Sequence, residues 1–188
     1  MITNLDFEKN LSTCSAINIL INSILLSFDK NNLVGGLFCD IHKAFDSVNH
    51  EILLAKLKIY GISCISNNLI RSYLTDRYQR VMIMNSRNTK TISSCELIRQ
   101  GVPQGSVLGP LFFHVYINDL ASVVEMYAIS VLFADDTSII ISSPKEAEFE
   151  SILSQVINDA VEWYKNNQLA LNLGKLNLCN LKLSQNYN

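Results

Sequence analysis

Three aspartates occupy positions where a carboxylate could take part in catalysis. Asp40 ends a short apolar run, and the pair Asp135 and Asp136 stands between two further apolar runs. An acid at the edge of an apolar segment is costly unless it is solvated, paired or bound to a metal ion. Each has an ordinary structural explanation, because Asp favours tight turns and helix caps. If the runs form neighbouring strands, however, all three carboxylates come to one place.

A cluster of three carboxylates has a definite chemistry. The charges repel one another and raise their own pKa values, and divalent cations relieve this repulsion. Mg²⁺ suits such a site because it prefers oxygen ligands and fills its other positions with water and substrate phosphates. Two such ions, ~3.5–4 Å apart, would stabilise the attacking and leaving oxygens of an in-line phosphoryl transfer.

The elements that must position these acids follow from periodicity and from end signals. Asn49 can cap a helix that Gly61 stops, the sequence from Ser143 to Glu146 is typical of a capping box, and the loop over residues 101–110 holds three glycines and two prolines. The expected helices cover residues 12–30, 50–60, 65–75, about 107–124 and the capping box to near Asn167; the expected strands cover 33–41, 79–85, 89–98, 127–134, 137–142, 169–173 and 176–183. Helices mixed with hairpins predict an α+β fold with a mostly antiparallel sheet backed by helices on one face.

Composition narrows the class of protein. The chain has 188 residues, of which 48% are hydrophobic and 17% charged, so we expect one folded domain rather than a disordered or low-complexity protein. Five cysteines without a close pair predict buried apolar residues in a reducing compartment. The longest apolar stretch, residues 17–28, is too short and too polar to span a bilayer, and the N-terminus is not a signal sequence. We therefore expect a soluble intracellular protein without a membrane partner.

Charge is distributed unevenly along the chain. All five arginines fall within residues 71–99, a segment of net charge +4, while residues 101–188 hold nine acids and four lysines. A basic segment in a mildly acidic chain is a pattern to weigh for a polyanion partner, although a solvated basic surface explains it as well.

Four segments together carry a family resemblance. They are FCDIHKAFDSVNHEILLAKL (38–57, motif A), RSYLTDRYQRVMI (71–83), RQGVPQGSVLGPLFFHVYINDL (99–120, motif B) and LFADDTSIII (132–141, motif C). In order and spacing they resemble the reverse transcriptase domain of non-long-terminal-repeat (LINE-like) retrotransposons, over about residues 7 to 183. The resemblance implies a polymerase palm with part of the fingers, and we expect residues 1–188 to be a single partial domain cut from a longer polyprotein, with the upstream fingers segment and the thumb absent.

The resemblance also implies roles for individual residues. Asp40 and Asp135 would bind two Mg²⁺ ions, which Mn²⁺ could replace, with Asp136 and the backbone carbonyl of Ile41 beside them. The expected partners are an RNA template, a DNA primer and deoxynucleoside triphosphates, and the expected location is the cytoplasm or nucleus. Asp46, Asn49 and His50 match the end of motif A and are interpreted as structural.

Residues around the metal site would contact the substrates. Phe45 stands at the family's steric-gate position, although from the sequence alone core packing is the better explanation. Gln104 and Gly105 would contact the incoming nucleotide or the template. Lys175 would be a general acid for the leaving pyrophosphate or, alternatively, a solvated loop lysine. The arginines expected to line the template–primer path are Arg71, Arg77, Arg80 and Arg99.

Two hypotheses from different classes remain open at this point. The chain is either an RNA-directed DNA polymerase domain or a catalytically inactive remnant that folds and at most binds nucleic acid or a partner. A phosphatase of the haloacid-dehalogenase type using Asp135 is disfavoured, because that chemistry needs a second acid two positions on, where Thr137 stands.

Overall fold

The computed structural model describes residues 3–4, 13–86, 88–172 and 177–181. Its centre is a five-stranded sheet in the order β1–β7–β8–β2–β9. The strands are β1 (Thr3–Asn4), β2 (Leu33–Asp40), β7 (Ala128–Phe133), β8 (Asp136–Ser143) and β9 (Asn177–Leu181). All neighbouring pairs are antiparallel except β1 with β7, so the expected mostly antiparallel sheet is confirmed.

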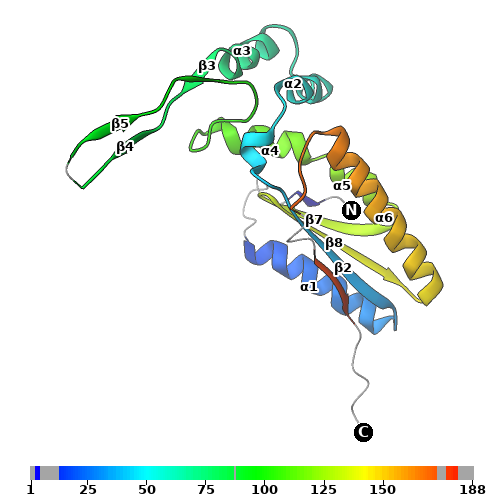
Figure 1. The fold of residues 1–188 in the computed structure, drawn as a ribbon. Coiled ribbons are helices and arrows are strands. Elements are labelled where there is room, and N and C mark those ends of the chain that lie inside the picture. Colours follow the sequence, from blue (N-terminus) through cyan, green and yellow to red (C-terminus); the bar gives the residue numbers. More distant parts are fainter. Residues whose placement is uncertain (1–2, 5–12, 87, 173–176, 182–188) are drawn as a thin grey trace.

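Helices cover both faces of this sheet (Figure 1). α1 (Thr13–Asp29) packs on one face, while α5 (Leu120–Val124) and α6 (Glu146–Asn166) pack on the other. The prediction of helices on one face only is therefore wrong. The reason lies in the strands: adjacent Val131 and Leu132 point to opposite faces and are both buried, and a strand that is apolar on both faces needs a cover on each.

A second group of elements extends beyond the sheet (Figure 1). The 3₁₀ turn η1 (Ala44–Ser47) leads from β2 into α2 (His50–Ile59) and α3 (Cys64–Leu74), and α4 (Leu108–Ile117) packs against α2 and η1. Between α3 and α4 a long hairpin projects away from the body. Its strands are β3 (Arg77–Gln79), β4 (Met82–Met84), β5 (Lys90–Ile92) and β6 (Glu96–Ile98). The predicted hairpin is confirmed, but it forms two short ladders, β3 with β6 and β4 with β5.

Several predicted boundaries shift. The expected helix over 107–124 is two helices, α4 and α5, with Asn118 and Asp119 between them. The capping box is wrong: Ser143 is the last residue of β8, paired with Leu33, and α6 begins at Glu146 without a side-chain cap. Strand pairing has taken the residue that local sequence assigned to the cap. Of the expected strand over 169–173, the described part contains a single bridge between Ile41 and Leu171.

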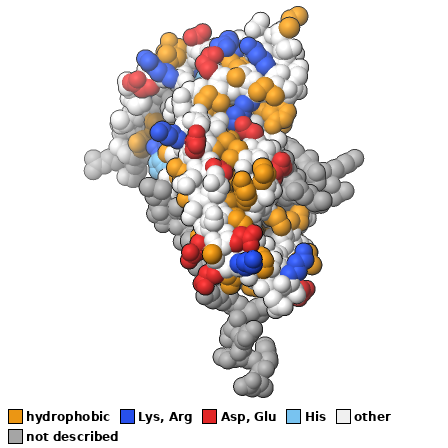
Figure 2. Space-filling view, turned by 90° about the vertical axis from the view of Figure 1, so that its right-hand side faces the viewer, with side chains coloured by type: hydrophobic (Ala, Val, Ile, Leu, Met, Phe, Trp, Pro, Cys, Tyr) orange, Lys and Arg blue, Asp and Glu red, His pale blue; other side chains and the backbone are white. Residues whose placement is uncertain are grey.

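Figure 2 shows the surface on the side of α6. Charged side chains of both signs gather at its upper and lower ends, with hydrophobic side chains between them. No helix of the described part is both long enough and apolar enough to cross a membrane.

The cysteines differ from the prediction of buried residues. Cys14, Cys64, Cys95 and Cys179 are exposed, and Cys39 on β2 is buried. Burial also raises the pKa of the Cys39 thiol to about 11, so little reactive thiolate forms there at neutral pH.

This difference gives a test of the sheet. In native protein at pH 8, we expect a disulfide reagent to modify four thiols quickly and the Cys39 thiol at least about 100-fold more slowly, because only the thiolate reacts and burial blocks access. In denaturant all five should react alike, and Cys39→Ala should remove the slow phase. Five equally fast native thiols would contradict the burial of β2.

Candidate active site

The three aspartates lie at one edge of the sheet, where β2 and β7 end and β8 begins. In the register of the sheet Asp40 lies directly opposite Asp136, and Phe133 pairs with the same Asp136. The turn between β7 and β8 therefore consists of Ala134, which has a positive φ of 52°, and the half-buried Asp135. Paired antiparallel residues are close cross-strand neighbours, so the register places two predicted metal ligands side by side and the third next in sequence.

The three carboxylates do not form a metal-binding cluster in this structure. Within the described residues no group of three or more His, Cys, Asp or Glu side chains is gathered so that it could hold a metal ion. The expected convergence of all three carboxylates is thus only partly met. The donor set still matches Mg²⁺ in chemistry, because it offers carboxylate oxygens at the ends of adjacent strands.

Asp40 has a partner that sequence reasoning missed. Asn172 donates a hydrogen bond from Nδ2 to Oδ2 of Asp40 and another from its backbone nitrogen to the Asp40 carbonyl, both at 2.9 Å. Ile41 bridges to Leu171, and the His42 nitrogen donates to the carbonyl of Ala170 at 2.8 Å. The segment after α6 is therefore held against the end of β2 that carries Asp40. Asp40 and Asn172 lie 132 residues apart in the sequence, so no local sequence pattern predicts this contact.

Phe45 lies in η1, where its half-buried ring packs against Phe113 of α4 with a centroid distance of 5.0 Å. The structure thus shows the packing role that the sequence alone favours. The steric-gate role stays a prediction.

The end of motif A is joined to the motif B loop by three short contacts. The backbone nitrogen of Gly101 donates to Val48 at 2.7 Å, that of Val102 donates to the carbonyl of Phe45 at 2.8 Å, and Nε2 of His50 lies 2.8 Å from the Gly101 carbonyl. Asn49 caps α2 through Oδ1, which accepts bonds from the backbone nitrogens of Glu51 and Ile52 at 2.9 and 3.1 Å. The structural interpretation of Asn49 and His50 is confirmed.

A cavity of about 650 Å³ lies between η1, the base of the long hairpin and the motif B loop. Three cations and several amides are among its lining residues, which include Lys43, Gln79, Arg77, Arg99, Gln100 and Gln104. Gln104 is exposed, with Nε2 3.4 Å from Oδ1 of Asp46, and Gly105 is exposed with a φ of 81°. The predicted nucleotide-contacting residue Gln104 and two of the four predicted arginines therefore share one cavity.

The other two arginines lie elsewhere. Arg80 is exposed in the projecting hairpin between β3 and β4. Arg71 on α3 makes a two-pronged ion pair with Glu51 on α2, and its guanidinium lowers the pKa of that exposed carboxyl. Arg71 has a structural partner that ties two helices together, which the sequence segment alone did not reveal. Lys175 lies outside the described residues.

A match to a protein family decides what these motifs belong to. The family described as reverse transcriptase (RNA-dependent DNA polymerase) matches residues 6–187. The chain belongs to the reverse transcriptase family.

Curated relatives place this reverse transcriptase among those of non-LTR retrotransposons. The chain is 31% identical over 186 residues to the probable RNA-directed DNA polymerase from transposon BS of Drosophila melanogaster, covering 92% of this chain and 19% of that protein. It is 29% identical over 175 residues to the RNA-directed DNA polymerase from mobile element jockey of Drosophila funebris, covering 90% and 18%. The chain thus spans about a fifth of the length of these relatives.

Solved structures support the fold. Apo telomerase from Candida tropicalis, truncated from its C-terminal domain, superposes with a TM-score of 0.64 at 16% identity, covering 93% of this chain and 36% of that one. Telomerase from Candida tropicalis in complex with a TWJ fragment of telomeric RNA gives a TM-score of 0.65 at 14% identity, covering 92% and 30%. At this identity the likeness shows a reverse transcriptase-like fold.

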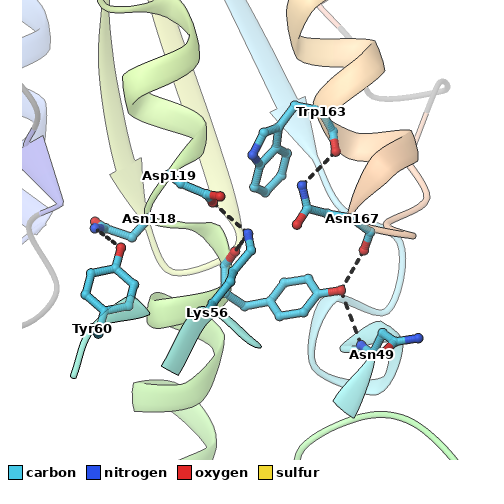
Figure 3. A network of polar contacts seen from close by, with 8 residues as sticks. Asn49, Lys56, Tyr60, Asn118, Asp119, Trp163 and Asn167 are labelled. Atoms are coloured by element: carbon cyan, nitrogen blue, oxygen red, sulfur yellow. Dashed lines mark hydrogen bonds and ion pairs between the residues drawn. The ribbon is translucent and has the colours of Figure 1, made fainter. Parts of the chain in front are cut away.

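A polar network, partly buried, joins the helices beside the sheet (Figure 3). Lys56 of α2 donates from Nζ to the Tyr116 carbonyl at 2.6 Å and to Oδ1 of Asp119 at 2.7 Å, and it lies 4.8 Å from the ring centre of Trp163. Burial lowers the pKa of Lys56, and the bond to Asp119 opposes that change. The Tyr116 hydroxyl donates to the carbonyl of Asn167 at 2.6 Å and accepts from the nitrogen of Asn49 at 3.3 Å. The network joins α2, α4 and the end of α6.

Replacing Tyr116 with phenylalanine tests this network. We expect a loss of about 1–3 kcal/mol at pH 8, because the buried Asn167 carbonyl loses its donor. Burial raises the pKa of Tyr116 from 10.0 to about 12. The stability that the neutral phenol contributes is therefore complete below pH 10 and is lost as the pH rises toward 12. Urea unfolding should show the gap between wild type and variant shrinking from pH 8 to pH 11.

Tyr60 provides the matched control. The side chain of Tyr60 is half-exposed, and its hydroxyl accepts a bond from Nδ2 of Asn118 at 2.8 Å, so Tyr60→Phe should change stability by less than about 0.5 kcal/mol. A Tyr116→Phe variant as stable as this control would contradict the structural role of the network.

Proposed function

We propose that the chain is the palm region of an RNA-directed DNA polymerase, which adds deoxynucleotides to a primer 3′-OH on an RNA template. One observation carries the proposal: the register of the sheet pairs Asp40 of motif A with Asp136 of motif C and sets Asp135 in the adjoining turn. These are the carboxylates that the family resemblance assigns to metal binding.

The metal site of this proposal uses the three aspartates and the backbone carbonyl of Ile41 to hold two Mg²⁺ ions, with Mn²⁺ as a substitute. When bound, such ions neutralise charge on the attacking and leaving oxygens of phosphoryl transfer. The protein's own contribution is to hold Asp40 and Asp136 on rigid, paired strands, so that no large rearrangement of these strands is needed.

The substrate contacts of this proposal come from the cavity and its surroundings. Lys43, Arg77 and Arg99 supply positive charge that attracts phosphates without reading sequence. In the same proposal Gln104 and Gly105 contact the nucleotide or template, Phe45 excludes a ribose 2′-OH, and Lys175 protonates the leaving pyrophosphate. In the same proposal Arg80 and Arg71 add positive charge along the template–primer path, and the ion pair with Glu51 holds Arg71 in place.

The partners and location follow from the relatives. Their names describe RNA-directed DNA polymerases, and one telomerase with this fold is in complex with an RNA fragment. We accordingly infer an RNA template, a DNA primer and deoxynucleoside triphosphates as partners, further polymerase segments as neighbours in a longer polypeptide, and an intracellular site of action.

Primer extension on poly(rA)/oligo(dT) with Mg²⁺ or Mn²⁺ tests the proposal. The 188-residue chain is compared with a chimera in which it replaces the matched segment of the jockey polymerase, since it spans about a fifth of such relatives. We expect extension by the chimera and little by the chain alone. A folded chimera that never extends a primer, beside an active parent jockey polymerase, would contradict the assignment.

A second candidate is a folded remnant without catalysis. It is favoured by the observation that the described carboxylates are not gathered into a ready-made metal cluster. It predicts an inactive chimera together with a cooperative unfolding transition for the chain.

A further inference from the structure

Asn172 makes two bonds to the same residue, and that residue is a predicted metal ligand. Its amide donates to Oδ2 of Asp40 and its backbone nitrogen donates to the Asp40 carbonyl, each at 2.9 Å. The backbone bond belongs to the short bridge between Ile41 and Leu171 and any residue could make it. The side-chain bond requires an amide or another donor at this position.

The position of Asn172 is fixed from the end of α6. The Tyr116 hydroxyl holds the Asn167 carbonyl at 2.6 Å, and Nδ2 of Asn49 donates to Oε1 of Gln168 at 2.8 Å (Figure 3 shows the Asn167 contact). Buried Leu169 is fixed by a bond from its nitrogen to the Tyr164 carbonyl at 2.9 Å. The chain thus reaches the end of β2 from residues that are themselves bonded to α4, α6 and the start of α2, and Asn172 meets Asp40 through both its side chain and its backbone.

An amide donor at a carboxylate has one consequence for cation binding that the geometry supports: it fixes the rotation of the carboxylate plane. Residues that orient metal ligands in this way are typically worth 10- to 100-fold in metal affinity.

We propose that Asn172 is a positioning residue that orients the Asp40 carboxylate for divalent-cation binding. The inference rests on the proposed function, because it takes Asp40 as a metal ligand. It assigns to the segment after α6 a task beyond sheet pairing: it sets the geometry of the metal site from the opposite end of the chain.

Mn²⁺ binding to the 188-residue chain, followed by the electron paramagnetic resonance of free Mn²⁺, tests this directly. We expect Asn172→Ala to raise the dissociation constant about 10-fold or more, and Asn172→Gln, which keeps the amide, to recover most of the affinity. Asn166→Ala, an exposed asparagine at the end of α6, is the matched control and should bind as wild type. Thermal unfolding by circular dichroism checks that each variant folds.

A double-mutant cycle separates positioning from general structure. In an Asp40→Asn background, Asn172→Ala should cause no further loss of affinity, because the group it orients is already gone. A full additional loss there, or wild-type affinity in Asn172→Ala alone, would overturn the proposal.

Asp135→Asn separates a failure of the positioning role of Asn172 from a failure of the proposed metal site. If Asp135→Asn weakens Mn²⁺ binding while Asn172→Ala does not, the positioning role alone is wrong. If neither variant changes binding, or wild type binds no Mn²⁺, the metal site of the proposed function fails and the role of Asn172 fails with it.

Discussion

Asp135→Asn is expected to lower RNA-templated nucleotide incorporation by the chimera about 10²- to 10³-fold or more, as for the loss of a group that stabilises transition-state charge. Asparagine has nearly the same shape and suits tight turns as well as aspartate does, so the turn between β7 and β8 should persist. What disappears is the negative charge beside the Asp40–Asp136 pair. The measurement is the single-turnover rate of incorporation at saturating nucleotide, with unfolding curves to show that the fold is retained.

Asp29→Asn is the matched control for this experiment. Asp29 is the exposed last residue of α1, just before the start of β2, whereas the carboxylates stand at the other end of that strand. We expect its rate to equal that of the unmutated chimera. Equal rates for Asp135→Asn would remove the turn aspartate from catalysis and with it the proposed metal site.

Gly101→Ala is expected to destabilise the protein strongly. Gly101 has a φ of +90°, and a Cβ there would lie 2.9 Å from both Cα and the carbonyl oxygen of Asp46. The positive φ costs an L-residue about 1–2 kcal/mol, and overlap with backbone that cannot swing away adds about 1–3 kcal/mol. For a chain of this length we expect a fall in melting temperature of roughly 5–15 °C.

Gly61→Ala separates the cost of a positive φ from the cost of steric overlap. Gly61 follows α2 with a φ of +88°, and nothing lies within 4 Å of a Cβ built there. It should therefore show only the conformational cost, about 1–2 kcal/mol. Thermal unfolding of both variants checks this, and equal shifts would mean that the motif A turn and the motif B loop are less tightly joined than the bonds at Gly101 indicate.

Local signals predicted the parts of the site that are built locally. Two acids between apolar runs predicted the hairpin of β7 and β8, which the structure confirms; its turn is Ala134 and Asp135, one residue earlier than predicted, and Asp136 belongs to β8. Asn49 as a cap and Gly61 as a stop were read from neighbours within one helix, and the structure confirms the cap. The order of the motifs predicted the family, and the mixture of helices with hairpins predicted the mostly antiparallel sheet, because both can be recognised in a single sequence.

Contacts between distant segments could not be predicted in this way. The bond from Asn172 to Asp40 joins residues 132 apart, and the pair of Arg71 with Glu51 depends on how α2 and α3 cross. The cover of the second sheet face by α1 rests on tertiary packing, and Ser143 joined β8 because pairing with Leu33 outweighed a local capping pattern. The metal site lies between the two cases: the apolar runs predicted its three aspartates and their convergence, but the structure meets that convergence only in part, with Asp40 opposite Asp136 and no group of three carboxylates gathered among the described residues.

Template-directed addition of a single nucleotide tests the central claim most directly. The chimera is given an oligo(dN) primer on four RNA templates that differ only in the first unpaired base, with Mg²⁺ and each deoxynucleoside triphosphate in turn. The account predicts addition of the complementary nucleotide alone, and none when the divalent cation is chelated. Addition that ignores the template base, or no addition by a folded chimera whose jockey parent is active, would contradict an RNA-directed DNA polymerase.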